Sequence, residues 1–100
     1  MATPTEKQLA ALRRLWVLAQ GHSGQCKTVA RFLLGLYNGQ RFPFDLTDFR
    51  CLDAGIFMDC ILVLTMDYTP QAEVHVVLGV PGSEFARLAD DWNITDREAA

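Results

Sequence analysis

Few of the side chains that most often carry chemistry occur in this chain of 100 residues. There are two histidines, His22 and His75, and three cysteines, Cys26, Cys51 and Cys60. A nucleophile needs an adjacent base and an orienting group, and neither histidine belongs to a motif that supplies them. No C-x-x-C pair occurs, and the gaps are too wide for a local zinc site. We therefore expect that the protein is not an enzyme and that it binds no cofactor and no metal. The cysteines are expected to be reduced. His22 is expected in a polar loop, and His75 is expected on a solvated face of a helix.

Acidic residues are more numerous, and Asp45 and Asp48 are close enough in sequence to suggest a cation site. Their spacing does not continue as the Asp-x-Asp-x-Gly loop that binds calcium. Asp45 and Asp53 each precede a helical pattern of apolar residues, where Asp is a favoured N-cap residue. Helix capping is therefore the preferred interpretation of these two residues.

The charges are distributed unevenly along the chain, whose formal net charge is −3. Residues 1–44 hold six basic residues and one acidic residue. Residues 45–66 hold one basic residue and four acidic residues. Residues 67–100 hold two basic and seven acidic residues. An asymmetry of this kind bears on partners and association rather than on the fold.

The elements that position these groups belong to one small domain, because about 100–150 residues is the usual domain size. Hydrophobic residues make up 50% and charged residues 21% of the chain, which is typical of globular proteins and excludes a disordered chain. Polar or charged residues interrupt every apolar run well short of about 18 residues, so no membrane span is expected. The N-terminal residues lack the order of a signal peptide, which favours a cytoplasmic protein.

Apolar residues recur at helical spacing and predict an all-α fold, a compact single-domain bundle of five to six short helices over residues 1–94. Residues 95–100 are expected to form a frayed C-terminal tail. Thr3, Pro4 and Glu6 predict a capping box at the first helix. The later helices are expected at about 24–37, 46–52, 54–66, 70–78 and 82–92, the fifth beginning at Thr69-Pro70 and ending at Gly79. Strand-like runs at 61–65 and 73–77 leave a β alternative there.

The expected core gathers the large apolar residues of these helices. The predicted core residues are Leu12, Trp16, Leu33, Phe57, Ile61, Leu64, Phe85, Leu88 and Trp92. The segment 54–66 is apolar nearly all round, which is typical of a central buried helix. Phe42-Pro43-Phe44 is interpreted as a plug that enters the core from a loop, with a partner-facing anchor as the alternative.

Residues 73–88, EVHVVLGVPGSEFARL, resemble a helix-turn-helix. The expected second helix carries Glu84, Asp90 and Asp91 around Arg87, whereas DNA phosphates require Lys and Arg on that face. We therefore prefer an ordinary helical hairpin. A regulator that binds DNA through residues 69–92 remains the alternative.

Two literal runs of sequence resemble a known family. Residues 32–39, FLLGLYNG, and 42–48, FPFDLTD, are similar to a family of small proteins from proteobacterial mobile elements, among which the chain resembles type I-F anti-CRISPR proteins. The likeness covers roughly residues 30–92 and continues through Met66-Asp67, Pro70, Glu73-Val74-His75, Leu78-Gly79 and Phe85. It implies a stoichiometric inhibitor that binds the crRNA-guided surveillance complex of a type I-F system, with type I-E as a second candidate. The implied binding site lies near the junction of the large subunit and a backbone subunit, and binding would stop the complex from engaging target DNA.

Charge complementarity indicates which residues would face such a partner, because its nucleic-acid channel is lined with Lys and Arg. The predicted partner-binding residues are Asp45, Asp48, Asp59, Glu84, Asp90 and Asp91. Asp45 and Asp59 are the weaker candidates, the first as a helix cap and the second through partial burial. The competing assignment places Arg13, Arg14, Lys27 and Arg31 against guide RNA or an acidic subunit. Binding to duplex DNA, a membrane or a small-molecule substrate is not expected.

Overall fold

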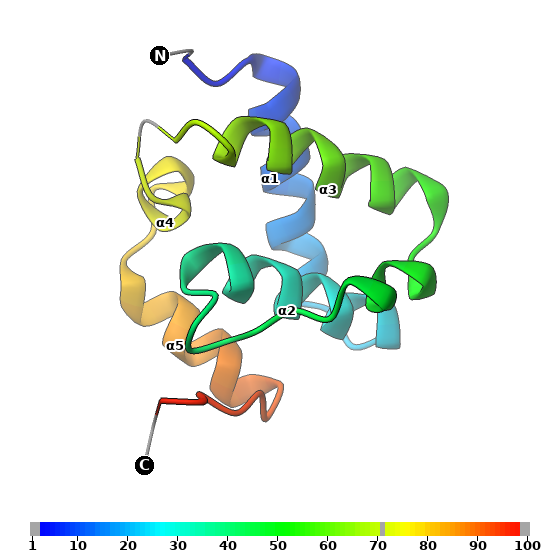
Figure 1. The fold of residues 1–100 in the computed structure, drawn as a ribbon, viewed down its shortest axis with the longest axis vertical. Helices are drawn as coiled ribbons and strands as arrows, with labels where there is room; N and C mark the ends of the chain where they lie inside the picture. Colours follow the sequence, from blue (N-terminus) through cyan, green and yellow to red (C-terminus); the bar gives the residue numbers. More distant parts are fainter. Residues whose placement is uncertain (1–2, 71, 99–100) are drawn as a thin grey trace.

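The computed structural model describes residues 3–70 and 72–98, which fold into six helices (Figure 1). These are α1 (Glu6–Ala19), α2 (Gly24–Tyr37), the 3-10 helix η1 (Leu46–Cys51), α3 (Ala54–Asp67), α4 (Val74–Leu78) and α5 (Gly82–Asp91). The described residues contain no strand, and the two strand-like runs lie within α3 and α4. The prediction of an all-α bundle is confirmed.

The first helix begins two residues later than its sequence pattern predicts. The N-cap is Thr5, whose hydroxyl accepts a hydrogen bond from the Gln8 backbone N–H at 3.1 Å, while the Gln8 side chain accepts from the Thr5 N–H at 2.9 Å. The predicted box on Thr3 and Glu6 is therefore wrong. The same Thr-x-x-Glu/Gln pattern recurs two residues on, and the second copy forms the cap.

The caps at α3 and α4 also differ from the predictions. Asp53 occupies the N-cap position of α3 but makes no capping hydrogen bond. Its carboxylate accepts from Gln25 Nε2 at 3.1 Å, and its N–H donates to Gln25 Oε1 at 2.6 Å, which ties α3 to α2. Helix α4 begins at Val74 rather than Pro70, and it ends, as predicted, at Gly79 in the left-handed conformation with φ 76°.

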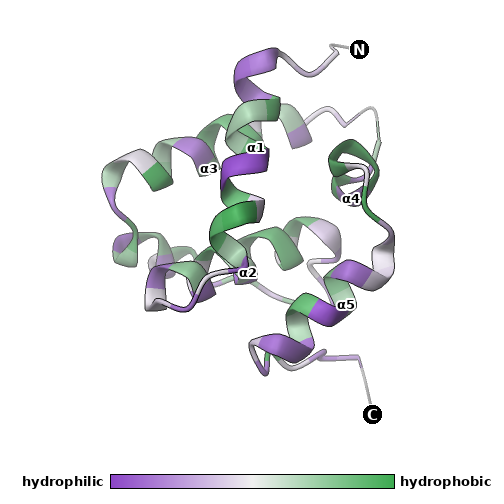
Figure 2. Ribbon diagram, turned by 180° about the vertical axis from the view of Figure 1, so that it is seen from behind, coloured by the Kyte–Doolittle hydropathy of each residue, from purple (hydrophilic) through white to green (hydrophobic). Residues whose placement is uncertain are grey.

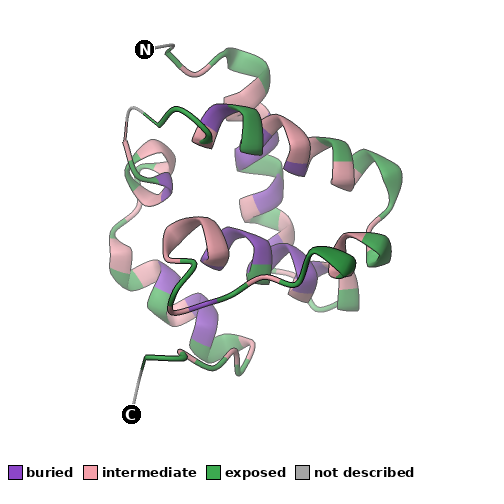
Figure 3. Cartoon of the chain, viewed as in Figure 1, coloured by how far each residue is buried: buried purple, intermediate pink, exposed green. Residues whose placement is uncertain are grey.

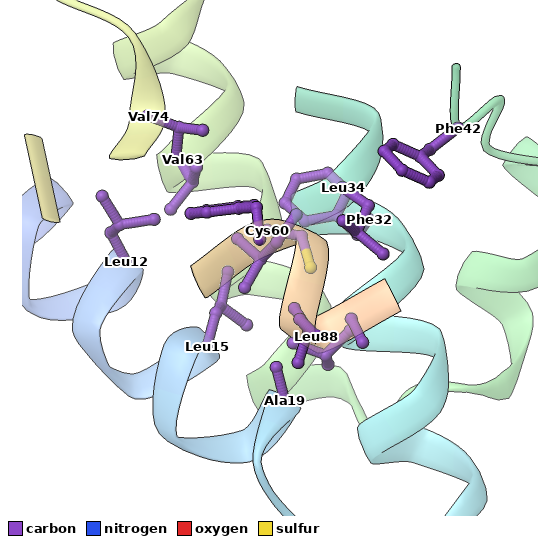
Figure 4. Close-up of a cluster of buried hydrophobic side chains, with 14 of the residues drawn as sticks. Leu12, Leu15, Ala19, Phe32, Leu34, Phe42, Cys60, Val63, Val74 and Leu88 are labelled. Carbon is purple, nitrogen blue, oxygen red and sulfur yellow. The ribbon is translucent and has the colours of Figure 1, made fainter. Parts of the chain in front are cut away.

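The centre of the fold is the pair α1 and α2. Helix α1 packs against α2, α3 and α4, and α2 packs against α4, α5 and η1. Figure 4 shows Leu12 and Leu15 of α1 meeting Cys60 and Val63 of α3, with Leu88 of α5 below them. Each large apolar side chain buried here contributes about 1.5–3 kcal/mol.

The predicted core is confirmed only in part. Leu12, Leu33, Phe85 and Leu88 are fully buried. Trp16, Phe57, Ile61 and Trp92 are half-buried and lie at the margin of the core, and Leu64 is exposed. The placement of Leu64 in the core is therefore wrong. In the loop before η1, Phe42 is buried as a plug, Phe44 is half-buried and Pro43 is exposed.

Helix α3 is not the central buried helix that its composition predicts. It lies along one edge of the molecule, with α1 beneath it (Figure 1). Only Cys60, Val63 and Met66 of α3 are buried, and Figure 3 shows most of its ribbon as intermediate or exposed. No helix of the described residues covers the opposite side, and η1 contacts only its margin, where the Phe49 ring lies 5.3 Å from the Phe57 ring. The apolar composition of residues 54–66 predicted a helix correctly, but it did not predict which side of the helix the other elements would cover.

Two residues after α5 contact Arg41, in the loop that precedes η1. Arg41 Nε donates to Asp96 Oδ2 at 2.8 Å, and the Arg97 N–H donates to the Arg41 carbonyl at 2.8 Å. The last two positions of the expected tail, 99 and 100, lie outside the described residues. Within the part of the chain that is described, every helix is too short or too polar to cross a membrane.

Candidate protein-binding surface

Large apolar side chains reach the surface most densely on α3. Met58 is 54%, Leu64 36% and Tyr68 85% exposed. Leu46 of η1, next to α3, is 74% exposed. Figure 2 shows α3 largely hydrophobic along its length, whereas polar residues recur along α5. Exposed apolar side chains that cluster in this way mark interaction surfaces more often than isolated ones do.

Beside α3 lies an apolar crevice of about 190 Å³, here called the η1 crevice. It is lined by Phe32, Gly35, Leu36, Gly39, Phe44, Leu46, Phe49 and Leu64. The Phe44 ring lies 4.9 Å from the Phe49 ring and 5.7 Å from the Phe32 ring. A Cβ on Gly35 would lie only 3.3 Å from the Phe44 Cβ, so a glycine lets the loop approach α2 this closely.

Two of the predicted partner-binding residues stand near this crevice, on η1 and its N-cap. Asp45 caps η1, as expected, by accepting hydrogen bonds from the Thr47 backbone N–H at 2.9 Å and the Thr47 hydroxyl at 2.7 Å. The hydroxyl and the backbone N–H hold the pKa of Asp45 below its usual value, so its carboxylate is charged. Asp48 lies 3.8 Å from Arg31 in a loose ion pair. The crevice therefore has two carboxylates at one margin, the second partly balanced by arginine.

Asp59 of α3 forms an ion pair with Arg14 of α1. Its two oxygens accept from Arg14 Nε at 2.9 Å and Arg14 Nη2 at 2.8 Å, which joins α1 to α3. The Asp59 side chain is 15% exposed, in agreement with the partial burial that the sequence suggested. The hydrogen bond to Asp59 raises the pKa of Arg14. Beside the pair lies a broad groove of about 730 Å³ between α1 and α3, lined by Arg13, Arg14, Val17, Leu18, Asp53, Gly55, Ile56 and Asp59.

Two of the three acidic residues of α5 form ion pairs with one arginine. Arg87 contacts Glu84 at 3.2 Å and Asp91 through a short hydrogen bond, and it also donates to Gln20 Oε1 at 2.9 Å. Asp90 is exposed and enters no ion pair within the described ranges. Of the charges predicted on α5, Asp90 is thus the most available to a partner.

The six predicted partner-binding residues do not form one site. They lie in three places: Asp45 and Asp48 at η1, Asp59 between α1 and α3, and Glu84, Asp90 and Asp91 on α5. The competing basic residues are also divided, with Arg13 and Arg14 on α1 and Lys27 and Arg31 on α2.

A family comparison bears on the whole of this helical unit. The sequence profile of a family of unknown function, DUF7673, matches residues 9–93, which span the chain from within α1 to just beyond α5. The chain belongs to the DUF7673 family. No curated protein and no solved structure matches this DUF7673 chain.

The histidines and cysteines of the DUF7673 chain belong to no metal-binding group among the residues described. No group of three or more His, Cys, Asp or Glu side chains there could hold a metal ion. Burial and, to a smaller degree, Asp59 raise the pKa of Cys60 to about 12, so this thiol stays protonated. His75 is not on a solvated face: its ring packs edge-on against Tyr37 at 5.3 Å, with Nδ1 3.5 Å from Glu73.

The candidate helix-turn-helix of the DUF7673 chain is a hairpin with a very short first helix. Helix α4 has five residues, and three residues, 79–81, connect it to α5. The His75 and Phe85 rings meet edge-on across the hairpin, with their centroids 6.5 Å apart. Glu84, Arg87 and Asp91 form the ion-paired cluster described above, which places carboxylates where a DNA-binding helix would present free Lys and Arg.

Proposed function

We propose that the protein is a stoichiometric, non-enzymatic inhibitor that binds the type I-F crRNA-guided surveillance complex and blocks its binding to target DNA. The proposed contact lies near the junction of the large subunit and a backbone subunit, and the type I-E complex is the second candidate target. The protein would act in the cytoplasm of the bacterial host, without a cofactor. The observation that supports this proposal most is the η1 crevice, an apolar hollow beside the exposed Asp45 and the half-buried Asp48.

An apolar hollow with an acidic margin fits a partner that presents an apolar anchor beside Lys or Arg. Buried anchors at the centre and polar contacts at the rim are the usual anatomy of a protein interface. Surveillance complexes hold their nucleic acids in positively charged channels, so the subunits that line them offer such basic residues. Asp45 and Asp48 would contact those residues, while Leu46 and Phe44 would bury the anchor.

The likeness of residues 32–39 and 42–48 to type I-F anti-CRISPR proteins supports the same region. These two runs build the crevice: the first contributes Phe32 and Gly35, and the second contributes Phe44 and Leu46. The net charge of −3 would also steer the protein toward a basic surface and accelerate association.

The test is a titration of purified type I-F surveillance complex with this protein, read out as target-DNA binding by fluorescence anisotropy. We expect DNA binding to be lost at about one protein per site. Leu46→Glu should weaken inhibition by about tenfold or more, as expected for a residue that contacts the central anchor. Asp48→Lys should weaken inhibition by a smaller factor and mainly slow association, as expected for a charge at the rim. Val76→Glu is the matched control, because Val76 is also exposed, at 58%, but lies on α4.

A second pair of variants separates the acidic from the basic assignment. Asp90→Lys with Asp91→Lys should weaken binding if α5 also faces the partner. If the acidic side faces the partner, Arg13→Glu with Arg14→Glu should leave binding to the surveillance complex intact. Normal binding by the first double variant, together with lost binding by the second, would reject the acidic assignment. A salt-sensitive shift of duplex DNA by the protein alone would instead favour the regulator that uses residues 69–92.

A further inference from the structure

The outward side of α3, together with its C-cap residue Tyr68, carries a regular seam of side chains. Ala54, Met58, Ile61, Thr65 and Tyr68 follow one another at steps of four, three, four and three residues. This alternation repeats every seven residues and keeps the five positions on one side of the helix, as at the contact seam of a coiled coil. Four of the five are exposed, and Ile61 at the middle is half-buried. The opposite side of α3, with Cys60 and Val63, is already packed against α1.

The seam contains no charged residue. The two charges of α3, Asp59 and Asp67, lie away from it, on sides where both are partly buried. Its one hydroxyl within the helix, on Thr65, already donates to the Leu62 carbonyl at 2.6 Å and accepts from Gln8 Nε2 at 3.1 Å. Covering the seam would therefore bury no charge and would leave no polar group of Thr65 without a partner.

We propose that the seam binds the same seam of a second copy of this chain, with the two α3 helices antiparallel and a two-fold axis at Ile61. About this axis, Ala54 of one copy lies opposite Tyr68 of the other, because both are seven residues from Ile61. The smallest side chain of the seam thus faces the largest, at both ends of the interface. Met58 and Thr65, which are three and four residues from Ile61, lie close to each other across the interface, and Ile61 meets its own copy. The face is self-complementary, as a two-fold interface requires.

Charge favours a second copy at this face over other faces of the molecule. Two chains of net charge −3 repel each other, and an approach through α5 would place Asp90 and its acidic neighbours close together. The α3 seam is uncharged, so this penalty is smallest there. A helix of 14 residues is about 21 Å long, and two such faces bury on the order of 1,000 Å² in total. That area is at the lower limit of specific interfaces, so we expect a weak dimer that forms only at high protein concentration.

The test measures mass against concentration for the full chain by sedimentation equilibrium, from about 1 µM to about 1 mM. We expect the mass to rise from 11.2 kDa toward twice that value. Met58→Glu and Tyr68→Glu should each raise the dimer dissociation constant by about tenfold or more, since each charge enters the interface twice. Val76→Glu, at a similarly exposed site on α4, should leave it unchanged. Circular dichroism confirms that each variant is folded.

Disulfide trapping tests the register independently. In a Cys51→Ser background, Ile61→Cys alone should form a covalent dimer under mild oxidation, because the two copies of residue 61 meet at the axis. Tyr68→Cys alone should not, whereas Ala54→Cys with Tyr68→Cys should. A chain that stays monomeric to about 1 mM, or cross-linking through Val76→Cys but not through Ile61→Cys, would overturn the proposal. The proposal is independent of the surveillance-complex target, because these measurements contain only this protein.

Discussion

Phe85 offers the most direct test of how the C-terminal helices are held to the fold. Its side chain is fully buried and lies between three aromatic rings, at 4.8 Å from Tyr37, 5.0 Å from Trp16 and 6.5 Å from His75. Phe85 is the largest fully buried side chain that α5 contributes to the core. Removing it should therefore loosen α5 from α1 and α2 together.

The expected loss of stability in Phe85 variants follows from the burial of this side chain and from its ring contacts. Phe85→Ala should lower the free energy of unfolding by about 3–5 kcal/mol, which combines lost transfer energy with the cavity left behind. Domains of this size are stable by only about 5–15 kcal/mol in total, so this variant loses a large share. Phe85→Leu retains most of the volume and loses mainly the aromatic pairs, and it should cost about 1–2 kcal/mol.

The assay is urea unfolding followed by circular dichroism, with unchanged slope as the criterion that the same cooperative unit unfolds. Val76→Ala is the control, since Val76 is exposed and should change stability by less than about 0.5 kcal/mol. The reasoning would be refuted if Phe85→Ala were as mild as this control. It would also be refuted if Phe85→Leu proved as costly as Phe85→Ala, because volume would then not be the deciding factor.

Three further predictions concern charge and thiol reactivity. Arg14→Met should lower stability only slightly, because the Arg14 side chain is 56% exposed and solvent screens its ion pair with Asp59. A double-mutant cycle with Asp59→Asn should lose its coupling at high salt, and a coupling that survives high salt would contradict this. Burial raises the pKa of Asp67 above the ordinary 3.8, so the folded state favours the protonated form, and stability falls as pH rises through the raised value. Asp67→Asn also removes a negative charge from a helix C-terminus, so the variant should be about 0.3–1 kcal/mol more stable than wild type at pH 7. If the free energy of unfolding changed with pH in the same way in both proteins, the assignment to Asp67 would be wrong. A thiol reagent at pH 7 should label the exposed Cys51 quickly and Cys60 only after unfolding, so equal labelling rates would be inconsistent with the buried thiol.

The helices themselves were predictable because each carries local signals. Apolar spacing identified all six helices, Gly79 identified the end of α4, and Asp45 identified the start of η1. Where the predictions were wrong, two local signals competed. Thr3 and Thr5 both begin a capping pattern, and Asp53 suits an N-cap but instead pairs with Gln25, 28 residues away. Such a distant partner leaves no trace in the local pattern.

The candidate surface was harder to predict than the fold. Whether a carboxylate is free depends on contacts far apart in sequence, such as the one between Arg14 and Asp59, 45 residues apart. Counting charges therefore overestimated the acidity that α5 presents, because Arg87 neutralises two of its neighbours. The exposure of Leu64 was missed because large apolar residues at helical spacing were assigned to the core. A usable signal was present: the absence of charge on the outward positions of α3.

That absence bears on what selected the sequence of α3. A surface helix ordinarily carries charged or polar residues on the side away from the core, and Met58 and Tyr68 are more than half exposed. Lysine or glutamate at these positions would disturb little of the packing beneath them, since the buried contacts of α3 run through Cys60, Val63 and Met66. Folding alone therefore does not account for their apolar character. Exposed apolar area carries a cost in solubility, and a binding partner on this face would offset it.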